Sequence, residues 1–302
     1  MFVAKRLKIM INKAIAQLGV LFLFLLSLLP LTVLLFFARL TYYLLYYIIG
    51  YRKKIVRKNL LASFPEKSLA EIITIEKDFF KYLADLMFEI IKMTTISKKE
   101  VLKRFKFKNV DVLRAHLQNG ASVLGCGGHF GNWELGGLSL GIELQTKTLM
   151  IYKPLSNKVF ENWLNNCRSR YGNVLIAMKQ TLREVVAYKK EPTLITFVSD
   201  QAPARSETKY FISFLSQPTA VMLGVEKIAM QTNRPIFFFK VRRIKRGYYE
   251  GDILPVCLDP QKTTDLEITK KHFALLETCI NENPALWLWS HNRWKIKPEN
   301  AQ

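Results

Sequence analysis

The chain has 302 residues, of which 50% are hydrophobic, so it is not a disordered chain and can form one large domain or two small ones. Its 45 Lys and Arg residues outnumber the 24 Asp and Glu residues, and the net charge of +21 favours anionic partners such as anionic lipid, an acidic protein or nucleic acid. The four cysteines form no CxxC pair and no metal-ligand spacing with histidine, so we interpret them as reduced thiols filling the core of a cytosol-facing domain.

The N-terminal segment has the pattern of a membrane anchor. Residues 14–37 carry no charge over 24 positions, and a helix needs about 20 residues to cross the hydrocarbon core. The run is longer than the apolar core of a signal peptide and is followed by tyrosines rather than by a small-residue cleavage site. Basic residues flank it on both sides, at Lys5, Arg6, Lys8 and Lys13 before the run and at Arg52, Lys53, Lys54, Arg57 and Lys58 after it.

Two arrangements of this anchor, residues 1–50, fit the pattern equally. One is a single span followed by an interfacial helix rich in tyrosine, which prefers the headgroup level. The other is a shallow hairpin that turns near Pro30 and leaves both ends on the cytoplasmic side. Either arrangement holds the remaining domain, residues 51–302, against anionic headgroups.

The remaining chain alternates between helical and strand patterns. We expect helices over 51–64 (basic and amphipathic), 69–93, 111–118 (capped by Asp111), 157–170, 181–188 and 219–231, with a further helix opening near Asn132. We expect strands over 105–108, 122–125, 148–152, 193–198 and 236–241. This order predicts an α/β fold with a mostly parallel sheet and helices on both faces, preceded by the N-terminal membrane-anchoring helix. Ligands of such sheets bind beyond the carboxyl ends of the strands.

A histidine and a carboxylate stand together at one such strand end. The segment SVLGCGGHFGNWEL at 122–135 combines a strand, a glycine-rich turn with His129, and a helix start that carries Glu134. On one continuous helix the two side chains would point about 140° apart, so they can meet only if His129 lies on the loop and Glu134 on the helix. A neutral imidazole can take the proton of an attacking hydroxyl, and a carboxylate on its other nitrogen can orient it. From spacing alone, a loop histidine and a glutamate that complements the helix dipole fit as well.

Six segments in the same order resemble the lipid A biosynthesis lauroyl/myristoyl acyltransferase family over nearly the whole chain. They are RKNLLASFP at 57–65, GHFGNWE at 128–134, YKP at 152–154, RSRYG at 168–172, DQAP at 200–203 and PALWLWSHNRWK at 284–295. GHFGNWE is similar to the His-x4-Glu core of that family, whereas related glycerolipid acyltransferases have Asp in the place of Glu134.

The resemblance implies transfer of a fatty acyl chain from acyl carrier protein to a hydroxyl of a lipid A precursor. It implies His129 as general base and Glu134 as its orienting partner, with no metal, no cofactor and no covalent acyl-enzyme. Arg170 is our first choice for the arginine that contacts acceptor phosphate or the developing oxyanion, and Arg168 is the alternative. Asp200 and Gln201 are expected to be substrate-binding residues, since DQAP follows a strand.

The resemblance also predicts the partners and the location. The partners are acyl carrier protein, anionic membrane lipid and the lipid A precursor, at the bacterial inner membrane with the catalytic domain facing the cytoplasm. The same chemistry on an amino-acid lipid or a glycolipid stays open. A membrane-tethered nucleic-acid-binding protein is suggested only by charge and lacks a nucleic-acid fold signature. The basic run at 240–246 has the pattern of a solvated face that could dock an acidic carrier, and His291 lies among tryptophans expected to serve packing or the membrane interface.

Overall fold

The N-terminal part of the chain forms two successive apolar helices. The computed structural model describes residues 2–298, with side chains from residue 10 onward except at Glu207, so the basic side chains predicted at Lys5, Arg6 and Lys8 lie outside the described residues. Helix α1 (Phe2–Leu28) ends before Pro30, and α2 (Leu31–Tyr43) continues into a π-helical segment, η1 (Leu44–Ile49). The stretches Met10–Leu28 and Leu31–Ile49 are each 19 residues long and apolar enough to cross a membrane.

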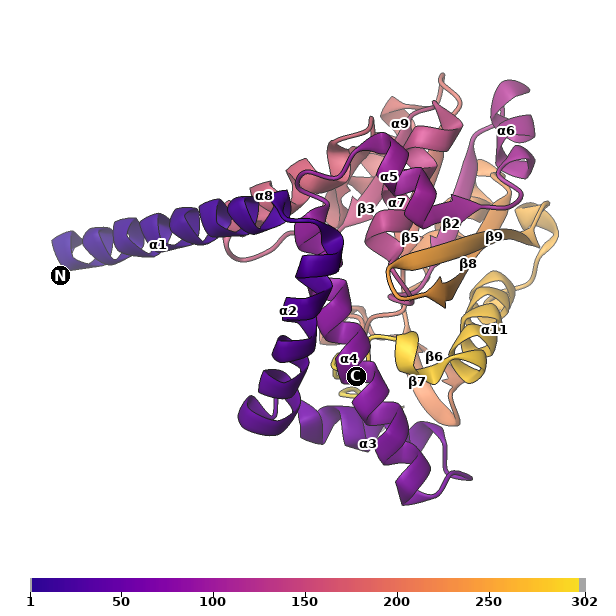
Figure 1. The fold of residues 1–302 in the computed structure, drawn as a ribbon. Coiled ribbons are helices and arrows are strands. Elements are labelled where there is room, and N and C mark those ends of the chain that lie inside the picture. The colour runs from indigo at the N-terminus through magenta and orange to yellow at the C-terminus, as the bar shows by residue number, and fades with distance from the viewer. Residues whose placement is uncertain (1, 299–302) are drawn as a thin grey trace.

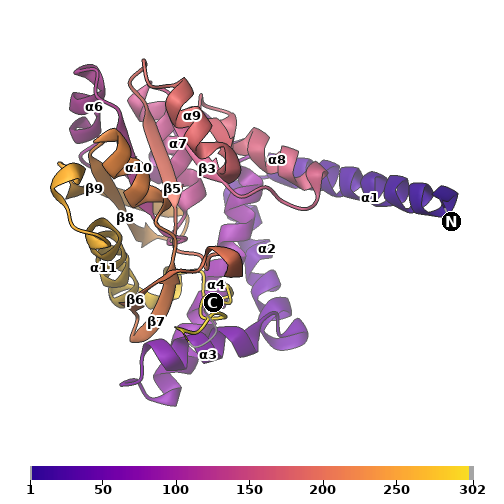
Figure 2. The same ribbon diagram turned by 180° about the vertical axis from the view of Figure 1, so that it is seen from behind.

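The two apolar helices lie very differently against the domain. The N-terminal part of α1 projects away from it and the rest of this helix contacts α8 (Lys158–Ser169) and α4 (Leu69–Lys92), whereas α2 runs along α4 (Figures 1 and 2). The buried side of α2 consists of Leu31, Leu34, Leu35, Ala38 and Tyr42, at the spacing of one helical face. The chain turns between Leu28 and Leu31, close to Pro30, and α2 buries its apolar face on α4, while the choice between a single span and a shallow hairpin stays a prediction. The division of the chain at residue 50 stays a prediction.

The break between α1 and α2 is held by side chains of the domain. The nitrogen of Pro30 cannot donate a hydrogen bond, so helical carbonyls before it lose their normal partners. The Lys92 ammonium donates to the carbonyls of Ser27 and Leu29 at 2.8 and 2.9 Å, and the Thr95 hydroxyl donates to Ser27 at 2.5 Å. These contacts join the end of α1 to the end of α4.

A seven-stranded sheet forms the centre of the domain, in the order β1-β9-β8-β2-β5-β3-β4. Its strands are β1 (Phe105–Phe107), β2 (Val123–Gly127), β3 (Thr148–Tyr152), β4 (Val174–Ala177), β5 (Leu194–Val198), β8 (Ile236–Lys245) and β9 (Tyr248–Cys257). All neighbouring strands are parallel except β8 and β9, which form an antiparallel hairpin. The prediction of a mostly parallel α/β sheet is therefore confirmed.

Helices cover both faces of this sheet. Helix α7 lies over one face, and α10 and α11 lie over the other (Figures 1 and 2). The helices after α2 are α3 (Lys53–Ser63), α4, α5 (Lys98–Arg104), α6 (Asp111–Gln118), α7 (Trp133–Leu144), α8 (Lys158–Ser169), α9 (Thr181–Ala187), α10 (Gly224–Thr232) and α11 (Glu267–Glu282), with a short 3-10 turn, η5, at Pro284–Leu286.

Two local predictions are wrong in detail. The helix expected over 219–231 begins only at Gly224, because residues 217–221 form β7 (Gln217–Val221), which pairs with β6 (Tyr210–Phe214) in a separate hairpin. Asp111 is the first residue of α6 rather than its cap: the N-cap position is Val110, and no side chain caps it. All four cysteines are free and buried, as core-filling thiols would be.

Candidate active site

The sheet register brings His129 beside Asp200. Strands β2 and β5 are parallel neighbours, and their last aligned pair is Gly127 opposite Val198. His129 follows the end of β2 by two residues, and Asp200 follows the end of β5 by two residues. The two side chains thus meet beyond the carboxyl ends of adjacent strands, where ligands of such sheets bind.

Asp200 holds the imidazole of His129 by direct contact. Nδ1 of His129 lies 2.5 Å from Oδ1 of Asp200, and this contact favours the tautomer of the neutral imidazole that has its proton on Nδ1 and its lone pair on Nε2. Oδ2 of Asp200 accepts two further hydrogen bonds, from the backbone N–H of His129 at 2.9 Å and from the indole N–H of Trp287 at 2.7 Å. Burial raises the pKa of Asp200, but the charge of His129 and these hydrogen bonds outweigh it and lower the pKa to about 2. Asp200 is therefore ionised at neutral pH.

The second nitrogen of His129 contacts the amide of Gln201. The amide Nε2 of Gln201 lies 3.2 Å from Nε2 of His129 and can donate to it. The His129 side chain retains 18% of its exposure, and the indole of Trp133 stands edge-on to the imidazole at 5.0 Å between ring centroids. A substrate hydroxyl can reach Nε2 by displacing the Gln201 amide, so the expected site residues His129, Asp200 and Gln201 form one cluster.

Glu134 contacts an arginine rather than the imidazole. It lies in the first turn of α7, where Asn132 caps the helix. Its carboxylate accepts hydrogen bonds from Nε of Arg168 at 2.7 Å and from Nη2 of the same guanidinium. Burial raises the pKa of Glu134, but Arg168, with a smaller contribution from His129, outweighs it, so the pKa lies below its ordinary value. Trp133 lies between the two groups and donates its indole N–H to Glu134 at 3.2 Å. The sequence predicted Glu134 as the carboxylate that orients His129, and the structure instead puts Asp200 in contact with Nδ1.

Arg168, not Arg170, is the arginine at this cluster. Arg170 follows the last residue of α8, and its Nη1 donates to the backbone carbonyls of Met93 (2.9 Å) and Thr94. These contacts tie α8 to the end of α4 and leave Arg170 away from Glu134. The last turn of α8 directs position 168 toward the start of α7, so the structure favours Arg168 over Arg170 as the candidate site arginine, and its contact with a substrate stays a prediction.

The C-terminal segment is hydrogen-bonded to the loop that carries His129, and the sequence analysis did not predict this role. Leu286 and Leu288 pair through their backbones with Gly131 and His129, at 3.0 and 3.1 Å. Trp287 is 1% exposed and donates to Asp200, so it orients the carboxylate that orients His129. His291 accepts a hydrogen bond from the backbone N–H of Ala202 at 3.1 Å, and burial lowers its pKa to about 4. The clustering of tryptophans with His291 was the available signal, and it indicates packing against the site.

Gly128 and the buried Glu89 help to shape the loop that carries His129. A Cβ on Gly128 would lie 2.6 Å from the Leu276 side chain and 3.2 Å from Oδ2 of Asp200, so the loop can approach the carboxylate this closely only with glycine there. The side chain of Asn132 accepts from Leu135 N–H at 2.8 Å and donates to the buried Glu89 at 2.6 Å. Burial raises the pKa of Glu89 to about 7, although its hydrogen bonds act in the opposite direction.

The basic run at 240–246 is not a freely solvated face. Lys240 pairs with Glu282 at 2.6 Å and Arg242 with Asp252 at 2.9 Å. The remaining two arginines of the run, at positions 243 and 246, turn toward α4 and share one of its carboxylates. Among the described residues, no group of three or more His, Cys, Asp or Glu side chains could hold a metal ion.

The sequence of this chain is similar to those of lipid A biosynthesis acyltransferases. A family model described as bacterial lipid A biosynthesis acyltransferase matches residues 4–296. The chain is 26% identical over 250 residues to a lipid A biosynthesis palmitoleoyltransferase of Escherichia coli, which covers 82% of this chain and 80% of that protein. It is 23% identical over 255 residues to a lipid A biosynthesis lauroyltransferase of the same species, covering 83% and 81%.

Proposed function

This chain belongs to the bacterial lipid A biosynthesis acyltransferase family, and on that premise we propose that it moves a fatty acyl chain from an acyl carrier protein thioester to a hydroxyl of a lipid A precursor. The observation that carries the proposal is the imidazole of His129, held at Nδ1 by Asp200 and contacted at Nε2 only by the amide of Gln201. A hydroxyl is a weak nucleophile at its ordinary pKa and needs such a base beside it.

The reaction follows from the protonation states of this pair. Nε2 of His129 takes the proton of the acceptor hydroxyl while the hydroxyl oxygen attacks the carbonyl carbon of the thioester. Asp200 stabilises the imidazolium that forms and stays ionised, in keeping with a pKa of about 2. The carbon–sulfur bond then breaks, the imidazolium returns its proton to the leaving sulfur, and ester and free thiol are released.

We assign the Glu134–Arg168 pair to charge stabilisation. The carboxylate of Glu134 is 4% exposed and fixes the guanidinium by two hydrogen bonds, which holds Arg168 in one orientation close to Trp133 and His129. A fixed guanidinium in a partly dry site can stabilise the negative oxygen that develops during attack. Glu134 then acts through Arg168 as a positioning residue, and the two form a functional unit.

The anchor and the net charge support the location and the donor. Two apolar helices attach the domain to a membrane, and we assign it to the bacterial inner membrane with the site on the cytoplasmic side, where acyl carrier protein thioesters are available. The charge of +21 favours association with an acidic carrier protein, because opposite surfaces steer association.

The full-length protein in detergent micelles tests the proposal. The assay follows radiolabelled acyl transfer from carrier-protein or coenzyme A thioesters to a lipid A precursor, with mass spectrometry of the product. We expect the carrier-protein donor to be preferred, its KM to rise with salt, and His129→Ala to lower kcat by about 10²–10⁴. His116→Ala, on α6, is the matched control and should keep its activity.

Equal use of both donors without a salt effect would contradict the role given to the carrier protein. Acylation of another lipid in place of the precursor would redirect the proposal to an amino-acid lipid or a glycolipid. Full activity of His129→Ala would remove the assigned base.

A further inference from the structure

A polar hollow of about 510 Å³ lies where the second apolar helix meets the domain. It opens between α2, α4, the β8–β9 hairpin and η5. Four cationic and two anionic side chains line it, namely Arg39, Lys81, Arg243, Arg246, Asp78 and Asp85, which leaves two positive charges in excess. None of these residues takes part in the chemistry proposed above.

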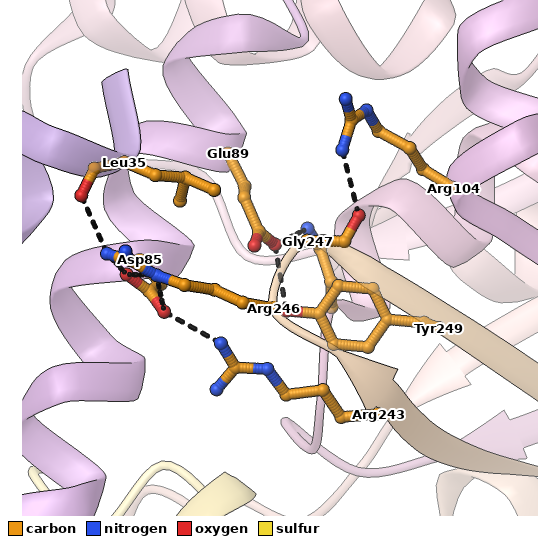
Figure 3. Close-up of polar contacts among 9 residues, drawn as sticks. Leu35, Asp85, Glu89, Arg104, Arg243, Arg246, Gly247 and Tyr249 are labelled. Atoms are coloured by element: carbon orange, nitrogen blue, oxygen red, sulfur yellow. Dashed lines mark hydrogen bonds and ion pairs between the residues drawn. The ribbon is translucent and has the colours of Figure 1, made fainter. Parts of the chain in front are cut away.

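Two arginines that line the hollow share one carboxylate. Nη2 of Arg243 donates to Asp85 at 2.7 Å, and Nε and Nη2 of Arg246 donate to the same carboxylate at 2.5 to 3.0 Å. Figure 3 shows both guanidinium groups turned toward Asp85, with Arg246 also donating to the carbonyl of Leu35 at 2.6 Å. Asp85 thus fixes two cations but neutralises only one, and Nη1 of each guanidinium makes no hydrogen bond to a described residue.

A third arginine reaches the hollow from the apolar helix. Arg39 is the only charged residue between Lys13 and Arg52 in the sequence. It is exposed and makes no ion pair or hydrogen bond with a described residue, whereas Lys81 is paired with Asp78 at 2.8 Å. A charge within an apolar membrane segment is costly, and its presence indicates a binding role.

We propose that this hollow binds a phosphate group carried by a membrane lipid. Guanidinium groups match the geometry of phosphate oxygens, and the excess positive charge requires an anion. Tyr42 and Tyr43 also line the hollow, and tyrosine favours the headgroup level of a bilayer, where lipid phosphates lie.

Two residues that line the hollow contact the loop that carries His129. Tyr82 and Leu286, both in its lining, bind Gly131, with the Tyr82 hydroxyl donating to its carbonyl at 2.6 Å and the Leu286 carbonyl accepting from its N–H at 3.0 Å. Gly131 follows His129 by two residues. A phosphate bound here would be separated from the loop that carries the base only by Tyr82 and Leu286, so it can belong to the acceptor, which would rest on the proposed function, or to a bilayer phospholipid, which would not.

Binding can be measured without any acyl transfer. The probes are short-chain phosphatidic acid and diacylglycerol with the same acyl chains, added to the full-length protein in nonionic detergent, and the readout is the melting temperature, which rises with ligand binding. We expect a rise with phosphatidic acid only, and a loss of affinity of about tenfold or more in Arg39→Gln and in Lys81→Gln. Lys13→Gln removes one cation from α1, which contributes no residue to the lining of the hollow, and should respond like the wild type.

The source of the phosphate follows from a second measurement. If Arg39→Gln raises KM for the precursor but not for the precursor stripped of its phosphates, the acceptor occupies the hollow. If Arg39→Gln abolishes phosphatidic acid binding while KM is unchanged for the precursor with and without its phosphates, a bilayer phospholipid occupies the hollow. Equal responses to phosphatidic acid and diacylglycerol, or a response that survives both Arg39→Gln and Lys81→Gln, would overturn the proposal, whether or not the protein acylates the precursor.

Discussion

Replacing Asp200 by Asn separates the orienting role of this residue from its contribution to packing. Oδ2 of Asp200 accepts two hydrogen bonds, from the His129 backbone and from Trp287, whereas Oδ1 faces only Nδ1 of His129. In Asp200→Asn the carbonyl oxygen must take the place of Oδ2, since the opposite orientation would leave two buried donors without acceptors, at a cost of about 1–3 kcal/mol each. The amide NH2 then faces Nδ1.

This orientation of the amide reverses the tautomer of the imidazole. Nδ1 of His129 must accept a hydrogen bond from the amide, so the proton moves to Nε2, and Nε2 can no longer take the proton of the acceptor hydroxyl. The equivalent change in a serine protease lowers kcat by about 10⁴, which corresponds to about 5 kcal/mol of transition-state stabilisation. We expect a loss of similar size here, together with a moderate fall in melting temperature near neutral pH, because the lowered pKa of Asp200 means that its ionised form stabilises the fold.

Single-turnover acyl transfer from carrier-protein thioester, combined with a thermal melt, measures both effects. Glu134→Gln is the matched comparison, because it neutralises the other buried carboxylate near His129. Turnover of Asp200→Asn within a few-fold of the wild type would refute the assignment of Asp200. If Glu134→Gln alone were inactive in that case, the original expectation that Glu134 orients the base would be restored.

Further predictions test the surroundings of the site. Arg168→Lys and Glu134→Gln each break the paired hydrogen bonds, so we expect kcat to fall by about 10²–10³ with KM little changed, and the double variant to be little worse than the worse single variant in steady-state kinetics. Because the folded-state pKa of Glu89 is raised to about 7 by burial, its contribution to stability is present at low pH and is lost as pH rises through 7; melting temperatures from pH 5 to 8 should fall for the wild type and change less for Glu89→Gln. Gly128→Ala places a Cβ 2.6 Å from an α11 methyl group and should cost about 1–3 kcal/mol in a thermal or chemical melt. The protein should stay in the membrane fraction after a high-salt wash, since salt screens surface charge contacts but not buried apolar area; release by salt alone would contradict an inserted anchor.

Local patterns were sufficient for many elements of the fold. The predicted bounds 111–118 and 148–152 coincide with α6 and β3, because each segment carries its own periodicity and ends near a turn residue. The helix expected over 219–231 failed at its start because residues 217–221 take their conformation from pairing with β6. Such pairing is a property of two segments and leaves only a weak trace in either one.

The anchor illustrates the same division. Absence of charge over 24 residues was enough to predict an apolar helical segment, since hydropathy and length are local properties. The structure divides this run between α1 and α2. That α2 buries one face on α4 depends on the complementary surface of α4, and so does the position of Arg39 at the hollow.

The sequence by itself determined the family resemblance, the alternation of strands and helices, and the chemical types at the site: an imidazole, two carboxylates and an arginine. Only the tertiary structure decided which groups touch. His129 and Asp200 are 71 residues apart in the chain and meet because β2 and β5 are parallel neighbours whose last aligned residues each precede the site residue by two positions. Glu134 is close to His129 in sequence but is turned to Arg168 by the start of α7, because side-chain direction follows the helix rather than the separation along the chain.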